Sequence, residues 1–249
     1  MRSSPTNHAV ATLLSTKRSG QIFRDDEFGE ITYRRVPRSR HVRIRMTSTG
    51  QLRASLPLFA PLSSLGKLID SSREELRKIA STSQDKTYVD GQLIGHSHGL
   101  QLIPNRNSIL KGSLSHQKII ISHPYDVPAS TAEVQSVIRQ HVAKALRIES
   151  KAYLPRRLKH LAEMGEFEYQ KVRFANQSGR WGSCSSSGTI SLNIALMGLP
   201  FELIDYVLIH ELAHTVEMNH SPQFWSLVET YYPDYKTARK ALKTHNPFI

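Results

Sequence analysis

Residues Tyr206 to Val216 read Tyr-Val-Leu-Ile-His-Glu-Leu-Ala-His-Thr-Val, and this stretch decides which kind of core the chain builds. Its apolar side chains cover nearly the whole circumference of a helix, which is typical of a helix buried on all sides. Glu211 is the only acidic residue in the stretch. Burying an unpaired carboxylate is costly, and a nearby cation would offset that cost. We therefore expect a buried helix with a cation beside it.

The polar residues of this stretch follow the pattern H-E-x-x-H from His210 to His214. Residues four apart lie above one another on one face of a helix, so both imidazoles can reach a single metal ion. Glu211 lies about 100° further round the helix, where it can address a water on that metal without being a ligand. The pattern predicts two zinc ligands and a general base. The alternative is that both histidines are ordinary core residues and that the pattern arose by chance. A chance match has a probability of roughly a few per cent in a chain of this length.

A catalytic zinc site needs a third protein ligand. His220 lies six residues after His214, and Asn219 tolerates the left-handed conformation that would end the helix there. Ser221 and Pro222 then suit the N-cap and first position of a following helix. This places His220 in a tight turn that faces the first two ligands. The alternative third ligands are two downstream acids, Glu229 and Asp234.

The sequence upstream of the motif predicts one long helix and a small sheet. Residues 130–133 (Ser-Thr-Ala-Glu) fit a capping box at the start of that helix, and Pro155 is expected to kink or interrupt it. Strands are predicted at residues 169–175, 181–184 and 189–194, the last two as a hairpin. Pro200 then opens the helix that carries the motif.

The first half of the chain predicts short strands, at residues 30–36, 41–47, 51–56, 88–94, 100–103, 108–114 and 118–122, with one helix at residues 63–80. The predicted fold class is therefore α+β. A flexible tail at residues 1–20 precedes a β-rich subdomain at residues 21–128, and a catalytic core with a short antiparallel sheet fills residues 129–249. Around residue 44, apolar residues alternate with arginines, which assigns Arg43 and Arg45 to the solvent face of a strand.

Composition and charge limit the partners and the cellular compartment that we expect for the protein. The chain has 249 residues and a formal net charge of +12, with arginines concentrated between residues 34 and 45. The positive charge of the N-terminal half of the chain is compatible with nucleic acid as a partner. The favoured interpretation of these arginines is a solvated strand face. The single cysteine, Cys184, excludes an internal disulfide and any C-x-x-C metal site. No apolar run is long enough for a membrane span, so we expect a cytoplasmic protein.

Other residues offer weaker candidates. Cys184 is expected to be a small packing residue, with a reactive thiol or an inhibitory zinc ligand as alternatives. His96 and His98 form an H-x-H pair that suits a second metal only on a strand, and a surface loop is favoured. Four residues could stabilise an oxyanion, and the sequence does not choose among Arg180, Tyr231, Tyr232 and His245.

Several of these segments together resemble the YgjP-like metallopeptidases. They are Arg-Trp-Gly-Ser-Cys-Ser at residues 180–185, Gly-Thr-Ile-Ser-Leu-Asn at 188–193, the stretch 205–214, Asn-His-Ser at 219–221, Phe-Trp at 224–225 and Pro-Asp-Tyr-Lys at 233–236. The resemblance implies a zincin-like core in which His210, His214 and His220 bind one zinc ion per chain and Glu211 is the general base. It also implies that the hairpin lies along the cleft, where its free edge could pair with an extended peptide.

The leading hypothesis is a zinc-dependent metallopeptidase that acts on a peptide or protein. A second hypothesis is a nucleic-acid-associated protease, by analogy with the related SprT-like proteases, whose basic half docks on DNA or RNA. A third is a non-catalytic, metal-stabilised binding module, which the base beside the metal argues against. The oligomeric state does not follow from the sequence.

Overall fold

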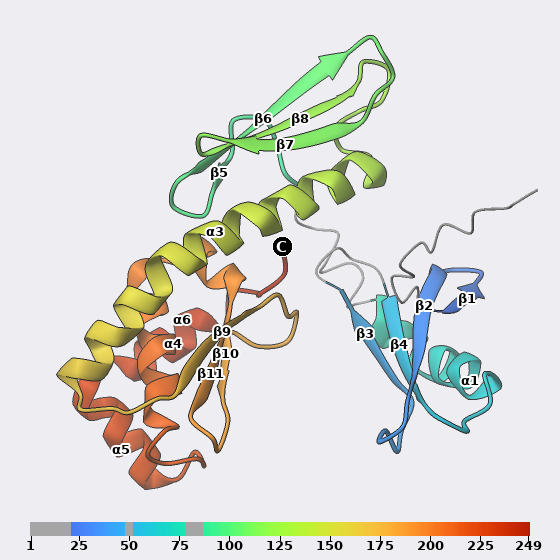
Figure 1. Cartoon of the computed structure of the whole chain (residues 1–249). Helices are drawn as coiled ribbons and strands as arrows, with labels where there is room; N and C mark the ends of the chain where they lie inside the picture. Colours follow the sequence, from blue (N-terminus) through green and yellow to red (C-terminus); the bar gives the residue numbers. More distant parts are fainter. Residues whose placement is uncertain (1–20, 48–51, 78–86) are drawn as a thin grey trace, which may run out of the picture. The chain divides into compact units, whose positions relative to one another are not determined.

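The computed structural model describes residues 21–47, 52–77 and 87–249, which fall into two compact units (Figure 1). Of the described residues, the N-terminal unit holds residues 21–45 and Leu52–Ser71, and the C-terminal unit holds residues 46–47, 72–77 and 87–249. The predicted tail at residues 1–20 and the predicted turn at residues 48–50 lie outside the described residues. No helix in the described part of the chain is long and apolar enough to cross a membrane.

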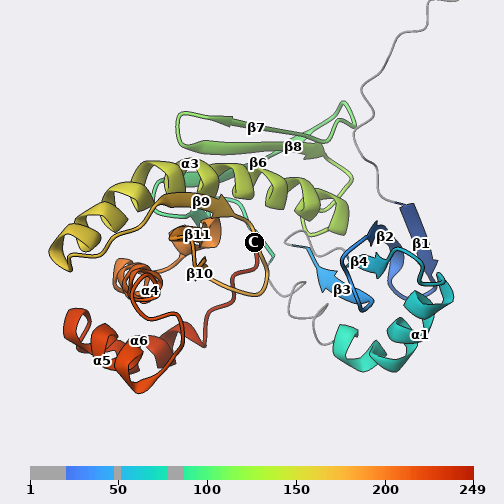
Figure 2. The same cartoon turned by 60° about the horizontal axis from the view of Figure 1, so that its bottom comes forward.

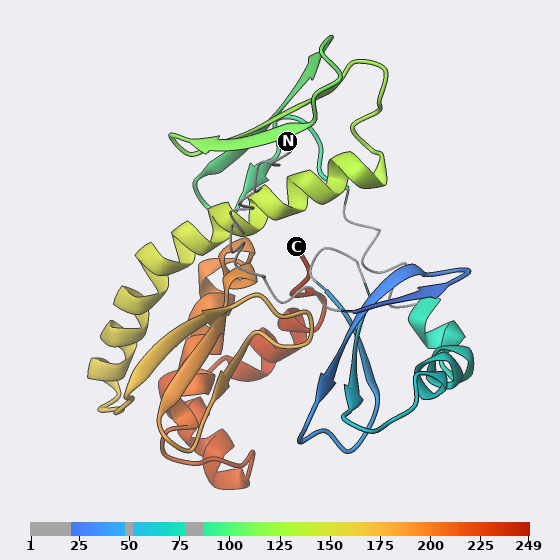
Figure 3. The ribbon, with the colours of Figure 1, turned by 45° about the vertical axis from the view of Figure 1, so that its right-hand side comes forward.

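The N-terminal unit is a four-stranded sheet with a helix on one face (Figure 3). Its elements are β1 (Gln21–Asp25), β2 (Gly29–Val36), β3 (Arg43–Met46), β4 (Leu52–Pro57) and α1 (Ser63–Ser71), with the strand order β1-β2-β4-β3. Ile31 and Leu56 of the sheet are buried, as are Leu65 and Ile69 of α1. A turn at Ser72 interrupts the predicted helix at residues 63–80, residues 73–77 are helical again, and residues 78–80 lie outside the described residues.

The strand around residue 44 has the predicted alternation. Met46 is buried, Ile44 is partly buried, and Arg43 and Arg45 are exposed, as is every arginine between residues 34 and 45. These guanidinium groups are solvated, so the strand needs no anionic partner to be stable.

In the C-terminal unit, one long helix lies between two sheets (Figure 2). The first sheet contains β5 (Leu93–Ile94), β6 (His98–Asn105), β7 (Lys111–Ser115) and β8 (Lys118–Pro124), in the order β5-β6-β8-β7. Helix α3 (Ala132–Met164) packs against it through Ile138 and Val142, which share one apolar core with Ile119 and Ile121 of β8. The predicted domain boundary at residue 128 therefore lies inside this unit, because the sheet before it and the helix after it bury each other.

Helix α3 differs from the prediction at its start and at Pro155. Its N-cap is Thr131, and no side chain caps it, so the predicted capping box is wrong. The helix also runs through Pro155 without interruption. Proline costs about 3 kcal/mol inside a helix because it removes a hydrogen bond and crowds the preceding turn. Leu154 and Leu158 are fully buried on either side of it, and burying such side chains offsets a cost of this size.

The other side of α3 carries the second sheet and the remaining helices. These elements are β9 (Lys171–Ala175), β10 (Gly182–Cys184), β11 (Thr189–Asn193), the 3₁₀ helix η1 (Ile194–Gly198), α4 (Phe201–Ala213), α5 (Pro222–Tyr231) and α6 (Tyr235–Leu242). The predicted hairpin is β10 and β11, which pair antiparallel. Strand β9 pairs with β11 in parallel, so this sheet is mixed and the prediction of an antiparallel sheet is wrong. The order β10-β11-β9 leaves β10 at an edge.

A buried carboxylate ties the first sheet to α3. Glu149 of α3 accepts hydrogen bonds from the backbone N–H groups of His96 and Ser97, from the Ser97 hydroxyl and from His98 Nδ1, the last at 2.5 Å. Burial raises the pKa of Glu149. These hydrogen bonds and the His98 ring together lower the pKa by more than burial raises it, so the pKa lies below its usual value. Gly95 has a positive φ of 61°, and a Cβ there would collide with the carboxylate. The turn between β5 and β6 therefore wraps around Glu149.

We expect Glu149→Gln to lower the free energy of unfolding of the C-terminal unit by about 2 kcal/mol at pH 7, the usual scale for hydrogen bonds to a charged group. Because the folded-state pKa is lowered, this stability is present above the unfolded pKa, about 4.3, and is lost as the pH falls through the folded pKa. The difference between wild type and variant should therefore shrink in acid. Denaturant titration followed by tryptophan fluorescence measures it, because Trp181 and Trp225 both lie in this unit.

The control for this variant is Glu163→Gln, which alters an exposed acid of the same helix that pairs only with Lys159 at the surface. It should change the unfolding free energy by less than about 0.5 kcal/mol. Equal stability of Glu149→Gln and wild type at pH 7 would contradict the assignment of Glu149 as a structural clamp.

Candidate metal centre

Helix α4 carries the H-E-x-x-H segment and is buried, as predicted. Leu208 and Leu212 are fully buried, and Glu211 is 5% exposed. The helix ends sooner than expected, since Ala213 is its last residue and His214 is its C-cap. Asn219 therefore does not end the helix, and that prediction is wrong. The chain turns instead over residues 214–217, where the backbone N–H of Glu217 bonds to the carbonyl of Ala213 at 2.9 Å.

The turn brings three imidazoles together. The ligand nitrogens of His210, His214 and His220 lie within 4.8 Å of one another, and the Nε2 atoms of His210 and His220 are 3.1 Å apart. Two nitrogens bound to one tetrahedral zinc are separated by about 3.3 Å, because each Zn–N bond is about 2.0–2.1 Å. Among the described residues this is the sole cluster of at least three histidine, cysteine or acidic side chains with metal-binding spacing.

Burial keeps the imidazoles of His210 and His214 neutral, and a hydrogen bond sets the tautomer of His214. His214 Nδ1 lies 3.1 Å from the carbonyl oxygen of Glu217, so it carries the proton and leaves Nε2 with a free lone pair. Burial, together with His214, His220 and Arg239, lowers the pKa of His210 to about 3. Burial also lowers the pKa of His214, against the raising effect of the Glu217 carbonyl. Neutral imidazoles are the form that binds a metal cation.

Aromatic side chains fix the position of His220 and its neighbours. The ring of Phe224, which is fully buried, lies within 5.0 Å of all three imidazole centroids. Trp225 stacks on His220 at 5.5 Å, and Arg239 covers the Trp225 ring at 4.5 Å. Ser221 caps α5 by accepting from the backbone N–H of Phe224 at 3.2 Å, as predicted. Arg239 was not singled out by the sequence, because it lies on a helix whose basic face resembles any solvated surface.

The two acids considered as alternative third ligands are engaged elsewhere. Glu229 pairs with Lys236 at 3.6 Å, and Asp234 accepts from the hydroxyl of Thr237 at 3.2 Å. Neither belongs to the cluster of potential metal ligands among the described residues. The geometry therefore favours His220 over both.

Glu211 lies in an apolar environment beside the imidazoles. Burial raises its pKa to about 8, and Arg180 opposes part of that rise. Its Oε2 is buried and has no hydrogen-bond partner within the described part of the chain. An orphaned carboxylate oxygen next to three converging nitrogens fits a site that holds a metal ion and a water molecule.

Gly182 of β10 makes room for the Glu211 side chain. A Cβ at residue 182 would lie 2.5 Å from Oε1 and 2.7 Å from Cγ of Glu211. Carbon atoms do not approach other atoms so closely in proteins, so any larger residue must displace the carboxylate. Sequence reasoning did not identify this role, because the two residues are brought together only by the packing of β10 on α4.

We expect Gly182→Ala to lower peptidase activity at least about tenfold without loss of metal, because a displaced carboxylate no longer addresses the reacting water. The measurement is the hydrolysis rate of a protein substrate at equal metal content. The matched control is Gly179→Ala, because a Cβ at residue 179 has no atom within 4 Å. Unchanged activity in Gly182→Ala would show that the position of Glu211 does not matter.

The histidine cluster opens into a small cleft of about 240 Å3 beside the edge strand β10. Gly182, Ser183 and Cys184 form one wall. Cys184 is half-buried, and burial together with Glu211 raises the pKa of its thiol. A raised pKa keeps the thiol protonated, which favours the packing role over a reactive thiolate.

The structure also separates the candidates for oxyanion stabilisation. The Tyr232 hydroxyl donates to the carbonyl of Glu202 at the far end of α4, at 3.1 Å, and Tyr231 packs edge-on against Phe167. His245 is exposed near the end of the chain. Arg180, which precedes β10, is the candidate whose charge acts on Glu211.

The prediction that the H-x-H pair lies in a surface loop holds for His96, which is exposed in the turn before β6, and is wrong for His98. His98 begins β6, is 5% exposed and bonds to Glu149, while His96 stacks on Phe201 at 4.1 Å. Neither belongs to a group with metal-binding spacing within the described residues. The burial of His98 could not be predicted from local sequence, because its partner Glu149 lies 51 residues further along the chain.

An α+β core that gathers three imidazoles and a carboxylate beside an edge strand defines the class of the protein, which is that of the metallopeptidases. The sequence pattern of the family described as "YgjP-like, metallopeptidase domain" matches residues 40–245. The chain therefore belongs to the YgjP-like metallopeptidase family.

One solved structure is similar to this chain, the metallopeptidase zymogen of Pyrococcus abyssi abylysin. The two are 30% identical over 36% of this chain and 91% of that chain, with a TM-score of 0.34. No curated protein matches the chain.

Proposed function

We propose that this metallopeptidase is zinc-dependent, with one zinc ion held by His210, His214 and His220 and with Glu211 as the general base. The observation that carries the proposal is the convergence of three imidazole nitrogens within 4.8 Å. Three nitrogen ligands leave one position of a tetrahedral ion open, which is the ligand count of catalytic zinc sites. A purely structural site closes all four positions.

The bound zinc would polarise the scissile carbonyl and lower the pKa of a water molecule. The residues of the chain supply the remaining steps. Glu211 takes the proton of the attacking water at its carboxylate and later delivers it to the leaving amine. Burial keeps bulk water away from this carboxylate and Gly182 leaves room for it, so it is positioned before the substrate arrives. Arg180 is the chain's candidate for the donor that faces the developing negative charge.

The proposed substrate is an extended segment of a peptide or protein. Among the described strands, β10 pairs with β11 alone, so the backbone groups of its outer edge are available to a further strand. Such an edge binds a peptide through main-chain hydrogen bonds regardless of sequence. The peptide would then pass beside the cleft that Gly182 shares with the histidine cluster.

Metal removal tests the proposal as a whole. Elemental analysis of the purified protein should find one zinc per chain, and a strong chelator should abolish hydrolysis of a labelled, unfolded protein substrate. Adding zinc back should restore the activity. Circular dichroism checks that the chelated protein stays folded. Full activity in the metal-depleted, folded protein would overturn the assignment.

Nucleic-acid binding is not part of the proposed function. The arginines between residues 34 and 45 are exposed, and exposed like charges need no ligand because water and salt screen them. A non-catalytic metal module is also disfavoured, because such a module needs no buried carboxylate beside its metal.

A further inference from the structure

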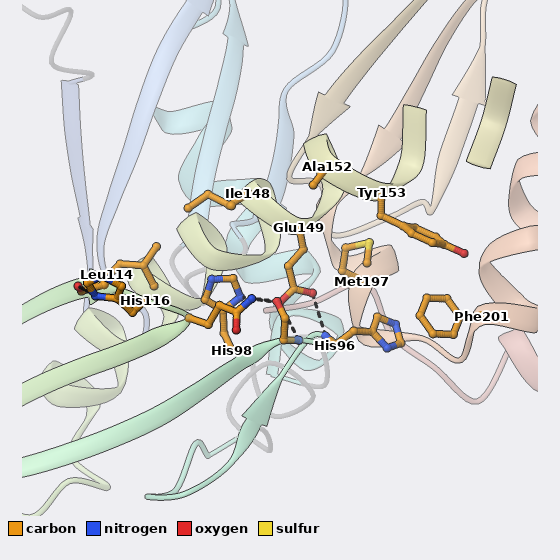
Figure 4. A pocket seen from close by; sticks show the side chains of 13 residues that line it. His96, His98, Leu114, His116, Ile148, Glu149, Ala152, Tyr153, Met197 and Phe201 are labelled. Atoms are coloured by element: carbon orange, nitrogen blue, oxygen red, sulfur yellow. Dashed lines mark hydrogen bonds and ion pairs between the residues drawn. The ribbon is translucent and has the colours of Figure 1, made fainter. Parts of the chain in front are cut away.

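A second cavity, of about 480 Å3, lies in the C-terminal unit and has no residue in common with the histidine cleft (Figure 4). It lies between the turn before β6, the turn between β7 and β8, helix α3 and the start of α4. Cavities of this size suit a small ligand or a large side chain. The catalytic mechanism proposed above makes no use of it.

One part of the wall of this cavity is apolar and aromatic. Phe201 stacks on His96 at 4.1 Å and packs against Tyr153 at 5.2 Å. Phe201 and Ile148, both on the wall, are 44% and 53% exposed, although large apolar side chains usually avoid water. Their exposure around one cavity indicates that a partner with an apolar, ring-shaped body fits there.

Polar side chains also line the cavity, and the buried ones among them are Glu149 and His98. The carboxylate of Glu149 is saturated by the groups that wrap it, so it is not free to bind a ligand. Its lowered pKa makes it an acceptor, which places the ring proton of His98 on Nδ1. Figure 4 shows His98 and Glu149 side by side at the cavity. No described residue bonds to His98 Nε2, which is left to interact with an occupant.

The free Nε2 atom of His98 determines which polar group suits it. With the ring proton on Nδ1, Nε2 carries a lone pair and accepts a hydrogen bond. A hydroxyl can donate that hydrogen bond. An aromatic ring that bears a hydroxyl therefore satisfies both the walls and the polar atom.

We propose that this cavity is a second recognition site, which takes the side chain of a tyrosine in the polypeptide substrate. This inference rests on the proposed peptidase function. Phe201 begins α4 and His210 follows nine residues later, which is about 14 Å along a helix axis. An extended chain covers that length in about four residues. A substrate tyrosine bound here would thus lie several residues from the scissile bond.

The test uses a variant that fills the cavity and a matched control. Ala152 is an exposed residue of α3 that lines the cavity, so Ala152→Leu occupies the space without disturbing the core. Lys151→Leu places the same side chain at the adjacent exposed position, which does not line the cavity. The probes are three fluorescent 12-residue peptides of glycine, serine and alanine with a central tyrosine, phenylalanine or alanine.

Anisotropy titrations with the Glu211→Gln background measure binding without hydrolysis. We expect the tyrosine peptide to bind at least about tenfold tighter than the alanine peptide, with the phenylalanine peptide in between. Ala152→Leu should remove the difference and Lys151→Leu should keep it. Equal binding of the three peptides, or a difference that survives Ala152→Leu, would overturn the inference.

Kinetics separate this inference from the proposed function. With active protein, Ala152→Leu should raise KM for a tyrosine-containing protein substrate about tenfold and leave kcat unchanged. Hydrolysis with an unchanged KM would overturn the second site and leave the peptidase assignment intact. Tyrosine-selective binding that Ala152→Leu removes, in a protein that hydrolyses nothing, would overturn the peptidase assignment and leave the second site intact.

Discussion

Glu211→Gln should lower the rate of peptide hydrolysis at least about a hundredfold while the fold and the zinc content stay the same. The amide has nearly the shape of the carboxylate, so the packing against Gly182 is preserved. The amide cannot take a proton from the attacking water. Loss of activity without loss of metal is the signature of a missing base.

The comparison requires turnover of the same unfolded protein substrate at equal zinc content. Glu202→Gln is the matched control, because it changes an exposed acid in the first turn of the same helix. It should retain wild-type activity. Equal turnover by Glu211→Gln and wild type would exclude Glu211 as the base.

His220→Ala should weaken zinc binding by about a hundredfold or more. Changing a residue that merely orients a ligand costs 10- to 100-fold in affinity, and loss of a ligand costs at least as much. The variant removes one of three converging nitrogens and leaves His210 and His214 as an incomplete ligand set. Titration of the metal-free proteins with zinc in a competing chelator measures the change.

Glu229→Ala and Asp234→Ala test the alternative ligands in the same titration. Both acids bond to neighbours away from the cluster, so we expect wild-type affinity from each. Full zinc retention in His220→Ala, with loss in either acid variant, would move the site to the class with an acidic third ligand.

Local sequence patterns were sufficient where the physical cause is itself local. The 3.6-residue period placed the buried helix and put His210 and His214 on one face of it, because that geometry depends only on the spacing. Ser221 was identified as an N-cap because capping involves a residue three positions away. Alternation alone assigned Arg43 and Arg45 to solvent.

Local patterns failed where packing overrides propensity. The chain continues as a helix through Pro155 because Leu154 and Leu158 are buried in the layer between two sheets. The motif helix ends at Ala213 although a plausible stop signal stands at Asn219. The predicted domain boundary at residue 128 rests on a change in composition. Composition carries no information about packing, so it does not reveal that β8 and α3 share one core.

The sequence by itself determined the α+β class, the H-E-x-x-H helix and the identity of the candidate ligands and base. Only the tertiary structure decided that β10 places Gly182 against Glu211, that the two downstream acids are occupied, and that Glu149 holds His98 at the edge of a second cavity. The physical reason is sequence separation. Helical spacing and capping act over three or four residues and leave a periodic signal, whereas these contacts join residues up to 51 positions apart and depend on how whole elements pack.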